Sequence, residues 1–267
     1  MFEKYASRFS EADIAKFILK YGLSRIEDYI KADVVIVGAG PSGLTTAYET
    51  SKMGLKTIVL ERTLGIGGGI RGGGMLIPSA IVEGDEAIKF FKDIGVKLNR
   101  IDEDLYEVNP VEAMLKIAVK AIDQGVLIWP GIIVEDVIIS EEGNSIRVRG
   151  VMINWTTIFE AGWHVDPLMI ESKAVVDATG HDADVIKIVS RRFPKLKIEV
   201  PGMSSMNIWM GEEQVVMRSG RVLKGLYLAG MAVAELYNTY RMGPVLGGMI
   251  SSGLKVAREI IKDLKGM

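Results

Sequence analysis

Hydrophobic residues along this chain follow two patterns, short unbroken runs and stripes with helical spacing. The run at 34–37 is unbroken, and 172–180 contains the apolar run 174–176, as expected of parallel strands buried on both faces. The stripes at 84–95, 111–125 and 247–266 predict amphipathic helices. The pattern therefore predicts an α/β fold with a Rossmann-like parallel sheet, of the type found in flavoproteins with two dinucleotide-binding domains.

Local signals predict the other elements. Ser10 and Asp13 have the spacing of a capping box at the start of a helix, whose apolar stripe is Ala12, Ile14, Phe17, Ile18 and Tyr21. Residues 24–31 predict a second short helix, and Pro167 is expected to start a helical turn. The remaining expected elements are short strands within 96–109, two strands in 126–140 broken at Pro130–Gly131, a hairpin in 143–155 with turn residues Glu142-Gly143-Asn144, and a last strand within 224–237.

The first strand opens a dinucleotide-binding unit. Gly38, Gly40 and Gly43 give the G-x-G-x-x-G spacing directly after the run 34–37. These glycines allow a tight turn, close approach of a pyrophosphate and close packing of the next helix, whose N-terminus favours phosphate. A second strand ends at Glu61, whose carboxylate is placed to accept both hydroxyls of an adenosine ribose. Strand, helix, strand and terminal acid together predict that the chain binds an adenine dinucleotide.

The identity of the dinucleotide depends on the residues after the second strand. Glu61 argues against a 2′-phosphate, although Arg62 beside it weakens this argument. The segment 64–76 is a second glycine-rich loop with one basic residue, Arg71. Such loops wrap the pyrophosphate in FAD-binding proteins of this type. The alternative is a flexible surface loop.

No composition break divides the 267 residues, so we expect one dinucleotide-binding domain over 1–267 with an inserted substrate region at about 75–170. Gly38, Glu61, Gly180 and Gly230 each follow an expected strand. Because ligands bind beyond the carboxyl ends of strands in open α/β sheets, these residues should converge on one crevice.

Composition excludes several classes of function. The mean hydropathy is +0.23, yet no stretch approaches the ~18 apolar residues that would span a bilayer. The net charge is −2 and the Lys and Arg residues are dispersed, so the sequence has no basic patch that would indicate nucleic-acid binding. The absence of cysteine excludes disulfides, iron–sulfur clusters and a cysteine nucleophile. With no apolar leader at the N-terminus, we expect a cytoplasmic protein.

The chain has two histidines, His164 in "WHVDP" and His181 in "ATGHDA". His164, Asp166 and His181 together form a two-histidine, one-carboxylate set, which suits Fe(II) and also Zn(II) or Mn(II). Short His-x-Asp matches arise by chance, and a histidine buried for structural reasons is the alternative reading of each position.

Several segments occur in one order from about Asp33 to Gly253. Together they resemble the thiamine thiazole synthase family, and the segments around 231–236 and 241–244 are more diagnostic than the glycine fingerprint. The segments are "VVIVGAGPSGL", "ERTLGIGGG", "GVMINWT", "HVDP", "ATGHDA", "LYLAGMAVAEL" and "RMGPVLGGMISSG".

The resemblance implies a specific chemistry. Members of the family use NAD as a substrate, condense its sugar with glycine, add sulfur to give an ADP-bound thiazole carboxylate, bind Fe(II) and assemble as homo-octamers. In one branch a cysteine just before x-Asp-Pro donates its own sulfur. This chain has His164 there and no cysteine elsewhere, which implies the archaeal-type branch that takes free sulfide.

The resemblance and the residues together assign roles. Gly38, Gly40, Ser42 and Gly43 are expected to hold the pyrophosphate, with Gly69 closing over it. Glu61 and Arg62 are assigned to the adenosine ribose, and Val134 to the adenine. Arg241 is the expected clamp for the glycine carboxylate. Asp166 and His181 are the implied metal ligands, and with His164 they form the catalytic set. His164 and Met231 are also placed at the nucleotide.

Three alternatives stay open. The same sequences have been linked to ribose 1,5-bisphosphate isomerisation, which is a related aldose–ketose conversion. A flavin-dependent oxidoreductase uses the same fold, although Met231 stands where FAD enzymes usually carry an aspartate. The third alternative is a non-catalytic protein that binds NAD or carries iron.

Overall fold

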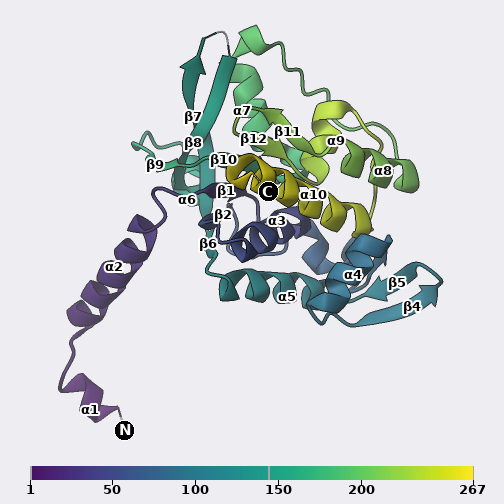
Figure 1. Ribbon diagram of the computed structural model, residues 1–267. Helices are drawn as coiled ribbons and strands as arrows, with labels where there is room; N and C mark the ends of the chain where they lie inside the picture. Colours follow the sequence, from purple (N-terminus) through teal and green to yellow (C-terminus); the bar gives the residue numbers. More distant parts are fainter. Residues whose placement is uncertain (1, 144, 267) are drawn as a thin grey trace.

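The computed structural model describes residues 2–143 and 145–266, which fold around a central, mainly parallel sheet (Figure 1). Its strands are β1 (Val34–Val37), β2 (Thr57–Glu61), β3 (Ala80–Glu83), β4 (Leu98–Asp102), β5 (Leu105–Val108), β6 (Leu127–Pro130), β7 (Ile132–Glu142), β8 (Ser145–Trp155), β9 (Leu168–Glu171), β10 (Ala174–Asp177), β11 (Gly220–Leu223) and β12 (Leu226–Leu228). The α-helices are α1 (Glu3–Ala6), α2 (Glu11–Glu27), α3 (Pro41–Lys52), α4 (Asp85–Asp93), α5 (Pro110–Asp123), α6 (Thr156–Glu160), α7 (Asp184–Arg192), α8 (Ile208–Arg218), α9 (Met231–Tyr237) and α10 (Gly247–Lys265). Short 3-10 helices are η1 (Gly69–Gly72), η2 (Gly74–Leu76), η3 (Gly180–Asp182) and η4 (Pro194–Leu196).

The central sheet has the strand order β11-β12-β10-β1-β2-β6, and its pairs are parallel except for β11 with β12. Strand β1 lies between β2 and β10. The chain first adds β2 and β6 on one side of β1, and later adds β10, β12 and β11 on the other side. An antiparallel sheet β7-β8-β9 and a small sheet β3-β5-β4 complete the fold. The α/β, Rossmann-like architecture predicted from the sequence is confirmed.

Alternate residues of β1 face two separate hydrophobic cores. Val34 and Ile36 belong to the core shared with α3, α5 and α10, whereas Val35 and Val37 belong to the core shared with β7, β8, β9 and α7. All four side chains are buried. Because both faces of the strand are covered, an unbroken apolar run forms it, rather than the alternating pattern of a half-exposed strand.

The region 75–170 contributes to all three sheets. Strand β6 pairs with β2 at the edge of the central sheet, β3, β4 and β5 form the small sheet, and β7, β8 and β9 form the antiparallel sheet. The expected break at Pro130–Gly131 separates β6 from β7, and the expected hairpin is β7-β8. Of its predicted turn residues, Asn144 lies outside the described residues. Residues 168–171 form β9, so the helical turn expected after Pro167 is wrong.

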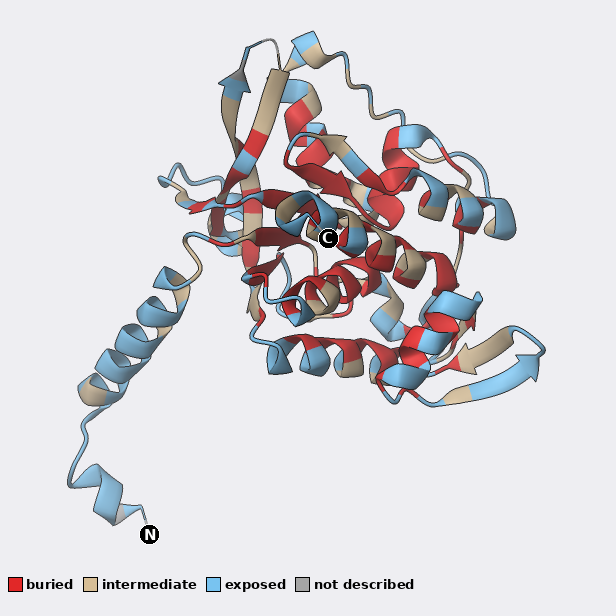
Figure 2. Ribbon diagram, viewed as in Figure 1, coloured by how far each residue is buried: buried red, intermediate tan, exposed pale blue. Residues whose placement is uncertain are grey.

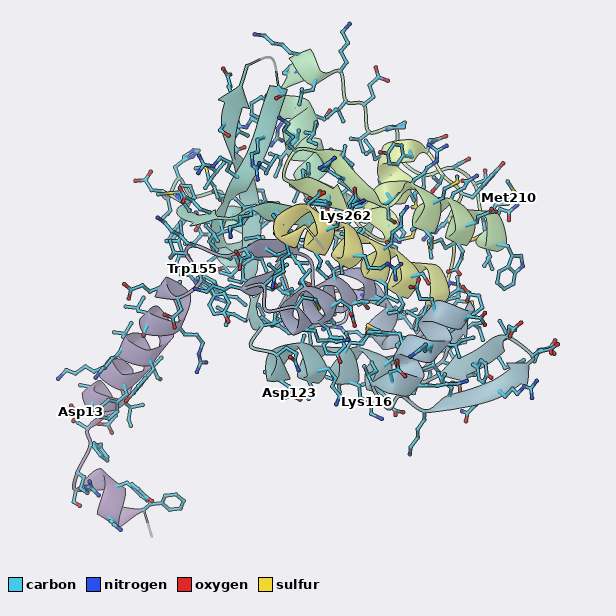
Figure 3. The ribbon with its side chains drawn as sticks, viewed as in Figure 1. Asp13, Lys116, Asp123, Trp155, Met210 and Lys262 are labelled. Carbon is cyan, nitrogen blue, oxygen red and sulfur yellow. The ribbon has the colours of Figure 1, made fainter. Side chains whose placement is uncertain are left out.

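The N-terminal helix differs from the prediction in length and packing. Its capping box is present, since the Asp13 N–H donates to the Ser10 hydroxyl and the Ser10 N–H donates to the Asp13 carboxylate. Helix α2 continues to Glu27, so residues 24–27 do not begin a separate helix. No residue of α2 is buried. The helix extends from the body with its apolar stripe and Asp13 in solvent (Figures 2 and 3). None of the helices in the described residues is long and apolar enough to cross a membrane.

Glu83 ends β3 beside the first residue of α10, Gly247. Burial raises the pKa of Glu83 to about 7, although the backbone N–H groups of Glu83 and Gly247 favour the charged form. Its Oε2 atom is buried and has no hydrogen-bond partner among the residues that the structure describes. The fold therefore favours the protonated carboxyl group.

We expect Glu83 to make the free energy of unfolding depend on pH. Because the folded pKa is raised from 4.5 to about 7, its contribution is complete below pH 4.5 and is lost as pH rises through about 7. The Glu83→Gln variant should be more stable than wild type at pH 8 by about 1 kcal/mol, after allowance for solvent screening. Urea unfolding at pH 5 and pH 8 measures this. Parallel pH profiles for the two proteins would contradict the assignment.

Candidate functional site

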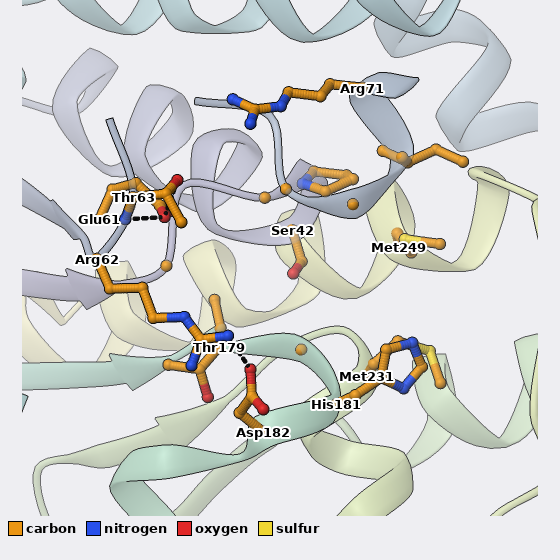
Figure 4. A pocket seen from close by; sticks show the side chains of 18 of the residues that line it. Ser42, Glu61, Arg62, Thr63, Arg71, Thr179, His181, Asp182, Met231 and Met249 are labelled. Atoms are coloured by element: carbon orange, nitrogen blue, oxygen red, sulfur yellow. Dashed lines mark hydrogen bonds and ion pairs between the residues drawn. The ribbon is translucent and has the colours of Figure 1, made fainter. Parts of the chain in front are cut away.

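A cavity of about 890 Å³ lies at the carboxyl ends of β1, β2 and β10. Its walls come from the first glycine turn, the second glycine-rich loop, η3 and the segment around Arg241 (Figure 4). These segments are far apart in the sequence and meet because parallel strands end at the same edge of a sheet. The volume is in the range of small-molecule and cofactor sites.

The first glycine turn forms the centre of this cavity. Gly38, Gly40 and Ser42 line it, and α3 begins at Pro41 with no side chain capping its N-terminus. The N-terminal N–H groups of this helix are therefore free to bind an anion. Gly43 does not line the cavity. A Cβ atom there would lie 2.1 Å from the Gly38 carbonyl oxygen, so this glycine allows α3 to pack against β1.

The second glycine-rich loop covers the first. The Gly67 N–H donates to the Ala39 carbonyl at 2.8 Å, and Gly69 and Arg71 line the cavity. This hydrogen bond joins the loop to the turn that it covers, which favours a role at the cavity over that of a flexible surface loop. Within residues 2–143 and 145–266, Arg71 forms no ion pair with a carboxylate. Its guanidinium is available to an anionic ligand.

Glu61 is held in place at one end of the cavity. The residue is 7% exposed, and its carboxylate accepts hydrogen bonds from the Ala39 N–H at 3.0 Å and from the Thr63 N–H and hydroxyl at 2.9 and 2.8 Å. A carboxylate has about four acceptor sites, so capacity remains for a ligand hydroxyl. Val134, on β7, lines the same end with Ile132 and Ile133 and gives it an apolar wall.

Arg62 points across the cavity wall to η3 and α7. Its guanidinium forms an ion pair with Asp182 at 2.6 Å (Figure 4). A second ion pair, at 3.7 Å, joins it to Asp184. Burial and the like charges of Asp182 and Asp177 raise the pKa of Asp184, whereas Arg62 lowers it. Neither aspartate was predicted from the sequence, although "GHDAD" places two carboxylates within three residues after His181.

Asp177 organises the turn that carries His181. Its fully buried carboxylate accepts the Thr179 hydroxyl at 2.7 Å, the Thr179 N–H at 3.1 Å and the Ile186 N–H at 2.9 Å. Burial raises the pKa of Asp177, against the effect of these hydrogen bonds. The carboxylate therefore joins the end of β10 to the first turn of α7 and holds η3 between them.

His181 and Arg241 occupy the end of the cavity opposite Glu61. Desolvation, and then the positive charge of Arg241, lower the pKa of His181, so its imidazole is neutral near pH 7. Met231 begins α9 and lies beside His181 (Figure 4). Like Arg71, Arg241 has no carboxylate partner in the described part of the chain. A neutral imidazole and an unpaired guanidinium suit a metal ligand and a carboxylate clamp, respectively.

His164 and Asp166 lie elsewhere. Both side chains are exposed in the loop between α6 and β9, and neither lines the cavity. No group of three His, Asp or Glu side chains that could hold a metal occurs within residues 2–143 and 145–266. One chain by itself therefore does not bring Asp166 to His181.

Comparisons with known proteins agree with this geometry. Residues 15–246 match the Thi4 family. The chain is 47% identical to a thiamine thiazole synthase of Saccharolobus islandicus over 95% of this chain and 94% of that protein, and 49% identical to one of Metallosphaera sedula over 96% and 93%. A crystal structure of Thermovibrio ammonificans THI4 superposes with a TM-score of 0.91 and 38% identity, covering 96% of this chain and 99% of that one.

Proposed function

Because the chain belongs to the Thi4 family and is an enzyme of thiazole biosynthesis, we propose that it makes the ADP-bound thiazole carboxylate from NAD, glycine and free sulfide, with Fe(II) as its metal. One observation carries the proposal. A single cavity joins a free helix N-terminus, the Glu61 carboxylate, the His181 imidazole and the Arg241 guanidinium. NAD would use the first three of these groups, with its adenosine ribose at Glu61, its pyrophosphate at the helix N-terminus and its reacting sugar at His181, while Arg241 would be left for glycine.

Different residues bind different parts of the NAD molecule. Gly38, Gly40 and Ser42 hold the pyrophosphate at the start of α3, and Gly69 covers it. Glu61 binds the adenosine ribose, while the apolar wall at Val134 takes the adenine. Arg71 adds a positive charge for the phosphates, and the nicotinamide ribose lies next to His181 and Met231. A methionine offers no strong acceptor for a ribityl hydroxyl, which favours NAD over a flavin.

Arg241 binds the glycine carboxylate. Its backbone is fixed between neighbouring segments, since the Arg241 N–H donates to the Ser205 carbonyl and its own carbonyl accepts from the Asn207 N–H. The planar guanidinium offers two parallel N–H groups to a carboxylate. Bound in this way, the amino group of glycine lies beside the sugar carbons with which it condenses.

His181 fits a ferrous ion as a neutral ligand on the cavity wall, whereas Asp166 fits only if it comes from another copy of the chain. We therefore propose that the loop at 162–167 of a neighbouring copy reaches the cavity in a homo-octamer, so that Asp166 of one copy and His181 of the other hold Fe(II). When bound, the metal would supply Lewis-acid chemistry and an open coordination position. His164 would lie beside the reacting sugar.

Sulfur must come from outside the protein, because the chain contains no cysteine. An imidazole at position 164 has no sulfur to donate. The protein would therefore complete many turnovers, with sulfide supplied from solution.

The Arg241→Ala variant should lose glycine incorporation and keep NAD binding. Removing a bidentate, charge-assisted contact should lower kcat/KM for glycine by about 10–100-fold, and Arg241→Lys should recover only part of it. Labelled glycine in the product and calorimetric titration with NAD measure the two effects. Arg100→Ala, on an exposed strand outside the cavity, is the matched control. Equal glycine incorporation in Arg241→Ala and in wild type would exclude the clamp.

A shared metal site predicts complementation between two inactive variants. Asp166→Ala and His181→Ala should each lose iron and activity. Mixed oligomers made by co-expression should regain roughly a quarter of wild-type activity, because some sites then combine an intact Asp166 with an intact His181. Iron content and anaerobic product formation are the measurements. If the mixed oligomers stay as inactive as each parent, the two residues do not act across copies.

The sulfur source predicts a change of mechanism when His164 becomes Cys. The wild type should need added sulfide, form several products per chain and keep its mass. His164→Cys should make one product without sulfide and lose the mass of one hydrogen sulfide molecule as the cysteine becomes dehydroalanine. Intact-protein mass spectrometry detects this loss, with His164→Ser as the control of similar size. Multiple turnovers by wild type in sulfide-free, metal-chelated buffer would refute the proposal.

A further inference from the structure

Arg62 stands at the position where a basic side chain can recognise a 2′-phosphate. It directly follows Glu61, the acid at the end of β2 that faces an adenosine ribose, and it lines the same cavity. In dinucleotide-binding folds an arginine near this point accommodates the phosphate of NADP. By sequence alone, Arg62 would therefore weaken the preference for an unphosphorylated ribose.

The structure shows this guanidinium already engaged. Asp182, in η3, and Asp184, at the start of α7, form ion pairs with it at 2.6 and 3.7 Å. The Thr156 hydroxyl separately fixes the Arg62 backbone by donating to its carbonyl at 2.7 Å. The ion pair between Arg62 and Asp182 lies below Glu61 in the view of Figure 4. The two terminal guanidinium nitrogens, which could bind a phosphate together, are thus each directed to a carboxylate.

The charges at this corner also oppose an added anion. One guanidinium faces two carboxylates, and the Glu61 carboxylate lies beside it on the same cavity wall. Arg62 and Asp182 are about half exposed, so their ion pair contributes little to stability. Its effect on a ligand is larger, because a 2′-phosphate would meet an excess of negative charge.

We propose that Asp182 and Asp184 determine specificity, by occupying Arg62 and excluding a 2′-phosphate from the adenosine end of the cavity. The inference rests on the proposed use of NAD, since it concerns the ribose that Glu61 binds. It adds two residues to that site and assigns Arg62 a role that depends on them. Binding of the phosphorylated nucleotide is then limited by these aspartates as well as by Glu61.

The test compares ADP-ribose with ADP-ribose 2′-phosphate, which differ only in the 2′-phosphate, by calorimetric titration of the full chain. Wild type should bind ADP-ribose at least about 100-fold more tightly. In Asp182→Asn/Asp184→Asn this ratio should fall by about tenfold or more, because Arg62 becomes free to bind the phosphate. Adding Arg62→Gln to this double variant should abolish the gain in affinity for ADP-ribose 2′-phosphate. Binding is measured without metal. A substitution at Asp182 therefore cannot change the measured affinities through a metal bound at the neighbouring His181.

A charge-matched control separates local from general electrostatics. Glu103→Gln/Asp104→Asn, on the turn between β4 and β5, removes the same charge far from the cavity and should leave the ratio unchanged. The single variant Asp182→Asn provides a milder change if the double variant is unstable. The inference is overturned if both aspartate variants keep the wild-type ratio of the two affinities. It is also overturned if the gain in affinity for ADP-ribose 2′-phosphate persists when Arg62→Gln is added. Failure of wild type to bind either nucleotide would instead refute the use of NAD, and this inference with it.

Discussion

The backbone at the end of β1 lies so close to its neighbours that no side chain fits between them. A Cβ atom on Gly38 would lie 2.4 Å from the Ala178 carbonyl oxygen, and one on Gly43 would lie 2.1 Å from the Gly38 oxygen. This contact places the start of α3 directly over the ends of β1 and β10. The anion site at α3 and the turn that carries His181 consequently face one cavity, and every assigned contact with the nucleotide depends on this arrangement.

Charge divides the cavity into two ends with different chemistry. At the Glu61 end, carboxylates outnumber the single guanidinium of Arg62, which suits the hydroxyls of an unmodified ribose. At the other end, Arg241 has no acidic partner in the described residues, and burial together with the charge of Arg241 lowers the pKa of the His181 imidazole. A dinucleotide would therefore be bound by hydrogen-bond acceptors at one end, while the other end receives an anionic co-substrate. Asp177 connects the two ends, because its hydrogen bonds fix the turn from which Asp182 and His181 both project.

Two exposed segments show what a single chain leaves incomplete. Helix α2 keeps its apolar side chains in solvent, and the loop at 162–167 carries Trp163 at 69% exposure next to His164 and Asp166. Apolar groups of this size are usually covered in the working form of a protein. Assembly of several copies would cover such surfaces, and under the proposed assembly the loop with Asp166 would reach the cavity of a neighbouring copy.

Elements with local signals could be predicted from the residues alone, whereas the contacts between those elements depend on how the chain folds in space. The buried run at 34–37, the glycine spacing after it and the acid at Glu61 were predictable, because burial on both faces and close backbone packing restrict the residues at each position. Helix α8 and the packing of α2 were not, because helical periodicity does not reveal which surface covers a helix. The pairing of Arg62 with Asp182 joins residues 120 positions apart, and the separation of Asp166 from His181 arises from the path of the loop before β9. Such relations depend on where distant strands end in space, which residue types and spacing do not specify.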